Sequence, residues 1–262
     1  AHGAAYRVAP DVFEELGARV VTMGVSPDGY NINDHCGSTA PAALCELVRA
    51  SGAHCGIALD GDGDRVILVD EHGGVVDGDG MLFILATAWA RSGRLHAPVV
   101  TTTMSNLALE QILGRQGIPL VRVEVGDHHV AEGMRRYGAN LGGEPSGHIL
   151  CLDRSTTGDG IVAALQVLEI MMATGQGLRQ LVQDYQPLPQ VLLNVPLPAC
   201  GLALGAPHIQ RAMTDASRTL ASRGRVVVRP SGTEAVIRVM VEGVDHKEAQ
   251  EVAASLAALL SG

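Results

Sequence analysis

The sequence is poor in aromatic side chains, in basic side chains and in long apolar runs. Only two Phe, one Trp and four Tyr occur in 262 residues, and 19 Lys and Arg stand against 28 Asp and Glu, which gives a formal charge of −9. Without a basic excess the chain lacks the cations that release counterions from nucleic acid or an anionic membrane. The longest apolar run, Met81 to Ala90, is half the ~20 residues of a membrane span. The composition argues against nucleic-acid and membrane partners.

Cysteine is also scarce, and no pair of cysteines is spaced as C-x-x-C. The five residues are Cys36, Cys45, Cys55, Cys151 and Cys200. An odd number in a chain of this size favours reduced thiols and therefore a cytoplasmic protein. None lies in a nucleophile motif, so structural thiols are favoured over a catalytic one.

Glycine, by contrast, is abundant, with 32 residues in 262, or about 12% against a usual ~7%. Many glycines lie beside Asp, Ser, Thr and Glu, which predicts sharp functional turns between regular elements. Hydrophobic residues make up 47% and charged residues 18%, a globular composition. The chain opens at Ala1 without Met, and we expect it to be a fragment of a longer protein.

Apolar periodicity predicts strands that alternate with helices. Strands are expected at 18–23, 54–59, 98–102, 120–125 and 148–152, and helices at 39–50, 79–91, 105–115, 127–136 and 158–173. Ser105 is the expected N-cap of the helix at 105–115. This alternation predicts crossover units, mainly parallel sheets and an α/β fold class.

Proline marks the main expected domain boundary. Four prolines lie between 187 and 198, and a weaker glycine- and aspartate-rich boundary falls at 71–80. After the proline-rich boundary, the apolar pattern predicts a helix at 208–222, strands at 225–229 and 235–241, and a helix at 246–260. We predict α/β domains with mixed sheets over 1–74 and 75–187, and a smaller α+β domain over 188–262.

The clearest chemical signal is the run Asp60-Gly61-Asp62-Gly63-Asp64-Arg65, here called the acidic loop. Three carboxylates at alternate positions can turn onto one point, where their repulsion requires a cation. Oxygen-only ligands suit Mg²⁺ or Ca²⁺. Arg65 would lie beside the ion as a phosphate ligand, because guanidinium offers a bidentate fork.

The acidic loop has two alternatives to a Mg²⁺ site. An EF-hand would use Asp60, Asp62, Asp64 and Glu71, but its sixth position needs Gly and holds Arg65. Its flanks also read as strands rather than helices. A solvated acidic turn without metal is the second alternative. We favour Mg²⁺, because three carboxylates leave room for water and a substrate phosphate.

Two further loops carry polar side chains between strands. The glycine loop, Gly142–His148, offers Glu144, Ser146 and His148 to vicinal hydroxyls; the alternative is a plain hairpin in which His148 caps a backbone group. The anion loop, 229–234, offers hydroxyls, backbone N–H groups and a guanidinium to phosphate, through Arg229, Ser231, Gly232 and Thr233.

Arg238 interrupts the apolar run 236–241 and shares a strand face with Val236 and Met240. A cation on such a face is costly unless it is paired. A second phosphate contact would explain it, and a surface salt bridge is the alternative.

Three weaker clusters remain. The run 101–106 lies where a strand passes into a helix, a common ligand position. The run 156–160 opens a helix, and the alternative role for its Asp159 is only that of a first-turn charge complementing the helix dipole. The pair His128-His129 could suggest zinc, but neighbouring helical residues are not expected to face the same way.

Together these motifs resemble the bacterial phosphoglucosamine mutases of the α-D-phosphohexomutase superfamily. The matching stretches, in family order, are LDGDGDRVILVD, TTMSN, GIPLVRVEVGD, GGEPSGHI, TTGDGIVAALQVL and RPSGTEAVIRVMVEG. The resemblance implies a cytoplasmic four-domain enzyme, a homodimer when intact. It would interconvert glucosamine 6-phosphate and glucosamine 1-phosphate through a phosphoserine and Mg²⁺, for UDP-N-acetylglucosamine and peptidoglycan synthesis.

The resemblance also implies a role for each matched residue. Asp60, Asp62 and Asp64 would bind Mg²⁺, and Arg65 would neutralise charge during transfer. The sugar hydroxyls would be held by Glu144, Ser146 and His148. The non-reacting phosphate would be held by Arg229, Ser231, Gly232, Thr233 and Arg238.

The chain departs from the family in three respects. No serine lies in a Ser-His-Asn-type loop, so we expect the phosphoserine to be absent and the fragment alone to be inactive. The family's Gly-Asp-Arg-Tyr reads Gly-Asp-His-His at 126–129 here. Pro145 and Ala235 replace a usual Asn or Gln and a usual Pro. A phosphomannomutase/phosphoglucomutase and an inert sugar-phosphate-binding fragment remain the alternatives.

Overall fold

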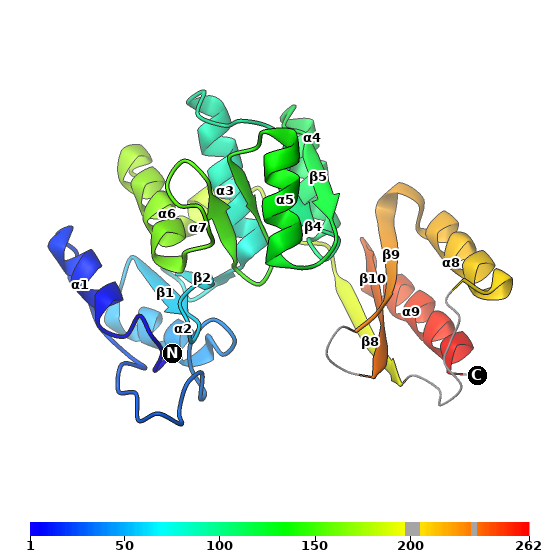
Figure 1. Ribbon diagram of the computed structural model, residues 1–262, viewed down its shortest axis with the longest axis horizontal. Helices are drawn as coiled ribbons and strands as arrows, with labels where there is room; N and C mark the ends of the chain where they lie inside the picture. The colour runs from blue at the N-terminus through cyan, green and yellow to red at the C-terminus, as the bar shows by residue number, and fades with distance from the viewer. Residues whose placement is uncertain (197–204, 232–234, 262) are drawn as a thin grey trace. The chain divides into compact units, whose positions relative to one another are not determined.

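The computed structural model describes residues 1–196, 205–231 and 235–261, and the chain divides into two compact units (Figure 1). Unit 1 comprises Ala1–Ser105 and Leu109–Tyr185, and unit 2 comprises Asn106–Ala108 and Gln186–Gly262. The division of the chain into three domains at 74/75 and 187/188 stays a prediction.

Unit 1 begins with two helices and an antiparallel sheet of order β1-β2-β3. These elements are α1 (Val8–Glu15), α2 (Ala42–Ser51), β1 (Cys55–Leu59), β2 (Val66–Asp70) and β3 (Val75–Val76). Helix α2 packs closely on β1, because a Cβ atom at Gly56 would lie 2.7 Å from Val48 Cγ2. The acidic loop is the connection between β1 and β2, whose register pairs Leu59 with Val66.

The second sheet of unit 1 has the order β5-β4-β6-β7. Strand β4 (Val99–Thr102) runs parallel to β5 (Leu120–Val123) and β6 (Leu141–Gly143), and β7 (Ile149–Cys151) is antiparallel to β6. The helices of this part are α3 (Gly78–Arg91), α4 (Leu107–Arg115), α5 (Asp127–Tyr137), α6 (Gly160–Thr174) and α7 (Leu178–Val182).

Helix α3 forms the centre of unit 1. It contacts β2 and β3 of the first sheet, β6 of the second, and helices α6 and α7. Its residues Gly78–Thr87 and Trp89 are buried, which explains the apolar run found in the sequence. Asp77 caps the helix by accepting a hydrogen bond from Gly80 N at 2.9 Å. Strand β2, which follows the acidic loop, and strand β6, which leads into the glycine loop, therefore both rest on one buried helix.

Unit 2 is a three-stranded antiparallel sheet of order β8-β10-β9 with helices packed on it. Its elements are β8 (Gln190–Pro196), α8 (Pro207–Leu220), the 3₁₀ helix η1 (Ala221–Arg223), β9 (Gly224–Pro230), β10 (Val236–Gly243) and α9 (His246–Leu260). Ile237, Val239 and Val241 of β10 form a core with residues of α8 and α9. The other face of β10 carries Arg238, Met240 and Glu242.

Three expectations about local structure are wrong. The sheets are not mainly parallel, because among the described strands the pairs β4–β5 and β4–β6 are parallel and the other five pairs are antiparallel. Residues 18–23 form no strand. Ser105 does not cap α4; Asn106 Oδ1 accepts the hydrogen bond from Ala108 N at 3.0 Å, while the Ser105 hydroxyl contacts the Thr101 hydroxyl.

The thiols agree with the sequence analysis as far as the structure extends. Cys36, Cys45, Cys55 and Cys151 are free, and Cys200 lies outside the described residues. Burial raises the pKa of Cys55 to about 11 and that of Cys151 to about 12, so both stay protonated at neutral pH. Within the described part of the chain, every helix is too short or too polar to span a bilayer.

Candidate functional site

The three carboxylates of the acidic loop lie together. One oxygen from each of Asp60, Asp62 and Asp64 lies within 4.8 Å of the others. Gly63, with φ +83°, allows the tight turn between them. Asp60 Oδ1 accepts hydrogen bonds from the backbone N–H groups of Gly63 and Arg65, both at 3.1 Å. The loop is therefore held in shape by its own backbone.

The electrostatics of this cluster favour a bound cation. Burial raises the pKa of Asp60, and the charges of Asp64 and Asp62 raise it further, against a hydrogen bond from the Arg65 backbone that lowers it. Asp64 Oδ1 is buried and has no hydrogen-bond partner among the described residues. Arg65 Nε lies 3.7 Å from Asp60 and 3.8 Å from Asp64 and offsets only part of the negative charge. These oxygens suit a hard divalent ion.

The EF-hand alternative is wrong. The acidic loop joins two antiparallel strands rather than two helices. Glu71, the twelfth position of that pattern, accepts a hydrogen bond from Arg179 N at 3.3 Å instead of joining the three aspartates.

The acidic loop and the glycine loop are in direct contact. His148 Nδ1 lies 3.1 Å from Asp64 Oδ2, and His148 forms a β-bridge with Arg65. Val66 N donates to Gly147 O at 3.0 Å. The alternative in which His148 only caps a backbone group is wrong. The contact spans 84 positions in the sequence, so local pattern gave no signal for it.

One further loop, the run 156–160, closes around this contact. Gly160 N donates to Gly63 O at 2.9 Å, and a Cβ atom at Gly158 would lie 2.3 Å from the His148 ring. Asp159 is the N-cap of α6 and accepts hydrogen bonds from its first turn. The run 156–160 thus packs against both loops, which the sequence suggested only weakly.

Glu144 is positioned by the start of α5. Its Oε1 accepts a hydrogen bond from Gly126 N at 3.1 Å, and its Oε2 lies 3.4 Å from Ser146 Oγ. Ser146 is exposed, so the pair can reach a ligand.

His128 and His129, in the first turn of α5, have ring centroids 3.9 Å apart. The expectation that these two rings face apart is therefore wrong. Among the described residues, the acidic loop is the only metal-type cluster.

The glycine loop also packs on the first residue of α3. Gly78 N donates to Pro145 O at 3.1 Å, and a Cβ atom at Gly78 would lie 1.9 Å from Glu144 O. Gly78→Ala should therefore lower the free energy of unfolding by about 2–3 kcal/mol, as overpacking does. Urea denaturation of the purified chain measures this.

Gly114→Ala is the matched control for that substitution. Gly114 lies in α4, and its added methyl group would meet nothing within 4 Å. It should raise stability by up to ~1 kcal/mol through helix propensity. Equal effects of the two substitutions would show that the glycine loop does not pack on α3.

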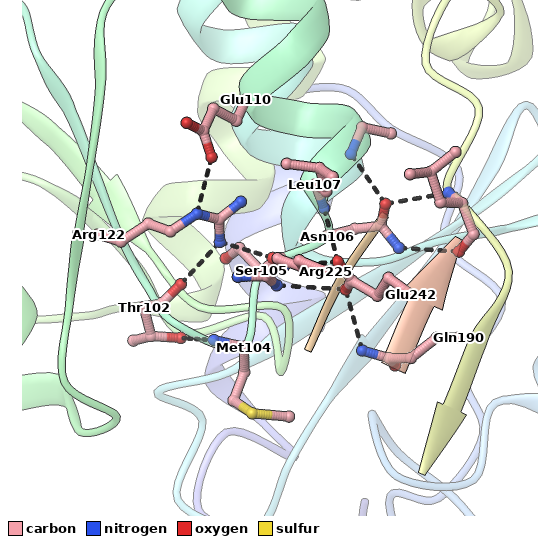
Figure 2. Close-up of polar contacts among 12 residues, drawn as sticks. Thr102, Met104, Ser105, Asn106, Leu107, Glu110, Arg122, Gln190, Arg225 and Glu242 are labelled. Atoms are coloured by element: carbon pink, nitrogen blue, oxygen red, sulfur yellow. Dashed lines mark hydrogen bonds and ion pairs between the residues drawn. The ribbon is translucent and has the colours of Figure 1, made fainter. Parts of the chain in front are cut away.

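The run 101–106 lies at the end of β4, with Thr101, Thr102, Ser105 and Asn106 buried and the two residues between them half-buried. Thr101 Oγ1 donates to Gly143 O at 2.8 Å, which links this run to the glycine loop. Arg122 of β5 holds the run by donating to Thr102 O at 3.2 Å and Ser105 O at 2.7 Å, and it also bonds Glu110 (Figure 2). The predicted passage from strand to helix is confirmed.

In unit 2, the cross-strand register pairs two of the predicted residues. Arg238 of β10 lies directly opposite Arg229 of β9 and, on its other side, Asn194 of β8. Like charges in this position repel unless an anion lies between them. Arg229 Nε is buried with no hydrogen-bond partner in the described part. Ser231 N bonds Val236 O at 2.8 Å, and Gly232 and Thr233 lie outside the described residues.

Glu242 is a buried carboxylate of unit 2 that the sequence did not single out. It is 0% exposed and accepts hydrogen bonds from Arg225, Gln190 and Leu107 N (Figure 2). The Arg225 bond is 2.7 Å long, and Asn106 of the same unit bonds Leu188 N and O. A buried carboxylate with these partners has a structural role. The only signal for Glu242 in the sequence is a charged residue at the end of a mainly apolar strand.

Comparison with known proteins gives consistent matches along the chain. Three family models match, all phosphoglucomutase/phosphomannomutase: alpha/beta/alpha domain II at residues 1–74, alpha/beta/alpha domain III at 77–188, and the C-terminal domain at 192–259. Phosphoglucosamine mutases of Alkalilimnicola ehrlichii and Rhodopseudomonas palustris strain HaA2 are each 53% identical, over 98% and 96% of this chain. The chain spans 57% and 56% of their lengths.

Solved structures match the fold at lower identity. The Aspergillus fumigatus N-acetylphosphoglucosamine mutase in complex with GlcNAc-6P and magnesium has a TM-score of 0.74 at 24% identity, over 91% of this chain and 58% of its own. A phosphoglucomutase/phosphomannomutase family protein of Burkholderia thailandensis has a TM-score of 0.75 at 20% identity, over 98% and 59%. The matching domain models and the relatives at 53% identity establish that the chain belongs to the phosphoglucomutase/phosphomannomutase family.

Proposed function

We propose that the chain carries the metal-, sugar- and phosphate-binding parts of a phosphoglucosamine mutase. The reaction would interconvert glucosamine 6-phosphate and glucosamine 1-phosphate. The observation that carries the proposal is the contact of the acidic loop with the glycine loop through Asp64 and His148. In this contact three carboxylates lie beside polar side chains, which supports a cation site next to a site for sugar hydroxyls. The glucosamine substrate is favoured by relatives that bear that name at 53% identity.

Each group has a proposed task in this reaction. Asp60, Asp62 and Asp64 would hold Mg²⁺, which supplies charge neutralisation for a transferring phosphoryl group. Arg65 would face the same phosphoryl oxygens, and its side chain is 46% exposed. Support for the ion comes from the buried, unsatisfied Asp64 oxygen and from the magnesium named with the Aspergillus fumigatus enzyme.

The sugar and the second phosphate would be held by the other two loops. Glu144, oriented by Gly126 N, would accept from sugar hydroxyls beside Ser146, and His148 would support them from its buried position. Arg229, Ser231 and Arg238 would hold the non-reacting phosphate, with Gly232 and Thr233. Each set of groups fits a part of phosphoryl transfer, which depends mostly on positioning and electrostatics. We place the protein in the cytoplasm, as a homodimer when intact.

Binding by the chain itself tests the substrate. Calorimetric titration in Mg²⁺ should give tighter binding for glucosamine 6-phosphate than for glucose 6-phosphate or mannose 6-phosphate. Preference for either of the latter two would favour the phosphomannomutase/phosphoglucomutase alternative. Equal and metal-independent binding of all three would favour an inert sugar-phosphate-binding protein.

The purified chain alone should give no mutase turnover. Transfer through a covalent intermediate needs a nucleophile to hold the phosphoryl group. No serine of the chain lies in the family's serine loop, and Ser105 is buried against Thr101. A coupled assay from glucosamine 6-phosphate, read against a buffer blank, measures this. Turnover by a preparation free of any full-length mutase would contradict the assignment of catalysis to the phosphoserine of the family's serine loop.

A further inference from the structure

The two glycines of the acidic loop are required for different reasons. Gly63 has φ +83°, a conformation that glycine adopts at little cost. The φ of Gly61 lies outside the left-handed region, so its backbone would accept a side chain. A Cβ atom at Gly61 would instead lie 2.5 Å from Ile32 Cδ1 and 3.0 Å from Asn33 Nδ2. A close neighbour, rather than the shape of the turn, therefore explains the missing side chain at Gly61.

The carbonyl group of Gly61 is held by a second segment, residues 3–4. Ala4 N donates to Gly61 O at 2.7 Å, and a Cβ atom at Gly3 would overlap the same oxygen. Close approach of two backbones therefore explains Gly3 as well. The Gly61 carbonyl belongs to the peptide that joins Gly61 to Asp62. Because this peptide is held, the direction in which Asp62 leaves the backbone is restricted.

Asn33 links these two segments at a cost to stability. Its backbone N–H donates to Ala1 O at 2.9 Å, and its φ is +59°, in the left-handed region. Its Oδ1 is buried and has no hydrogen-bond partner among the residues that the structure describes. A buried acceptor without a donor lowers the stability of a fold. Stability alone therefore does not explain the asparagine side chain at this position.

We propose that residues 1–4 and 32–33, here called the clamp, fix Gly61 and so the directions of the carboxylates on either side of it. Ile32 and Asn33 are the positioning residues of the clamp, and neither is a ligand. Carboxylates that already point to one place lose less conformational freedom when a divalent cation binds. Groups that hold metal ligands in place commonly change metal affinity by about 10–100-fold. This role rests on the cation site of the proposed function.

Compensating substitutions test the contact at Gly61. Binding of Mn²⁺, which takes the same oxygen ligands as Mg²⁺, is measured on the whole chain by the loss of the paramagnetic resonance signal of the free ion. Gly61→Ala should weaken Mn²⁺ binding by about tenfold, because its methyl group displaces the loop against Ile32. Adding Ile32→Ala removes the two nearest atoms, Cδ1 and Cγ1. The double variant should return to within about threefold of the parent affinity, since contacting residues are coupled.

Two control substitutions accompany this pair. Val75 of β3 is 52% exposed, close to the 55% of Ile32, and Val75→Ala should restore nothing when combined with Gly61→Ala. Gly114→Ala adds a methyl group that meets nothing within 4 Å and should leave Mn²⁺ affinity unchanged. Parent affinity in Gly61→Ala, or equal recovery with Val75→Ala and with Ile32→Ala, would overturn the clamp.

Asn33→Gly separates positioning from stability. Glycine keeps the left-handed backbone at position 33 and removes both the orphaned oxygen and the amide beside Gly61. The melting temperature of the metal-free chain should therefore stay the same or rise, while Mn²⁺ affinity falls by about tenfold. A fall in melting temperature at unchanged Mn²⁺ affinity would give Asn33 a structural role only and overturn its place in the clamp.

The same titrations distinguish the clamp from the cation site itself. Mn²⁺ binding that is lost in Asp62→Ala but unchanged in Gly61→Ala and Asn33→Gly would reject the clamp and leave the cation site. No Mn²⁺ binding by the parent chain, or binding that survives Asp62→Ala, would reject the cation site and the clamp with it. Loss in Asp62→Ala together with weakening in the two clamp variants supports both.

Discussion

Asp62→Ala is expected to abolish the rise in melting temperature that Mg²⁺ gives the chain. Asp62 is one of three carboxylates whose oxygens lie within 4.8 Å of each other. At a free Mg²⁺ concentration 100 times the dissociation constant, binding adds about 2.7 kcal/mol to stability. For a chain of this size that corresponds to a shift of about 5–10 °C. Thermal melts with and without Mg²⁺ measure the shift in the parent chain and in the variant.

Glu46→Ala is the control for that loss of charge. Glu46 is an exposed residue of α2, away from the acidic loop in the sequence. Its variant should keep the whole Mg²⁺-dependent shift. A shift that survives Asp62→Ala would mean that the ion binds elsewhere. Because the ion is held only by this loop in the proposal, such a result would also remove the support for Arg65 as a phosphate ligand.

Arg238→Leu is expected to weaken binding of glucosamine 6-phosphate by about tenfold or more, with little loss of stability. A hydrogen bond to a charged group contributes about 1.5–3 kcal/mol. Removing one of two directly opposed arginines also removes a repulsion that lowers the stability of the sheet. Calorimetric titration measures the affinity, and thermal melting of the same preparation measures the stability.

Two variants give this experiment its controls. Arg238→Lys keeps the charge and loses the bidentate fork, so its affinity should fall between those of the parent and the leucine variant. Arg211→Leu removes an exposed arginine of α8 in the same unit and should change neither quantity. A large loss of stability at unchanged affinity in Arg238→Leu would favour the surface salt bridge over the phosphate contact.

The chemistry-bearing loops could be found in the sequence because each is continuous. Asp60, Asp62 and Asp64 alternate with glycine, and this spacing alone predicts convergence, which the structure confirms. The partners of these loops could not be found in the same way. The His148–Asp64 contact and the Gly126–Glu144 contact join residues far apart in the sequence. They depend on how α3 brings the two sheets of unit 1 together.

The errors in secondary structure have physical reasons as well. Residues 18–23 have strand composition, but strand formation needs a partner that composition cannot supply. The strand–helix alternation predicted parallel sheets, but short turns such as the acidic loop connect strands as antiparallel hairpins. Asn106 and Ser105 are both good N-caps, and the buried Thr101 hydroxyl contacts Ser105, leaving Asn106 to cap α4.

Turnover by a chimera tests the central claim most directly. In the chimera, this chain replaces the matched region of the Alkalilimnicola ehrlichii phosphoglucosamine mutase, and mutase rates are measured in Mg²⁺ on three sugar phosphates. We predict turnover of glucosamine 6-phosphate above that of glucose 6-phosphate and mannose 6-phosphate, and its loss in the Asp62→Ala chimera. A folded chimera that prefers mannose or glucose 6-phosphate, or that keeps its rate without Asp62, would contradict the account.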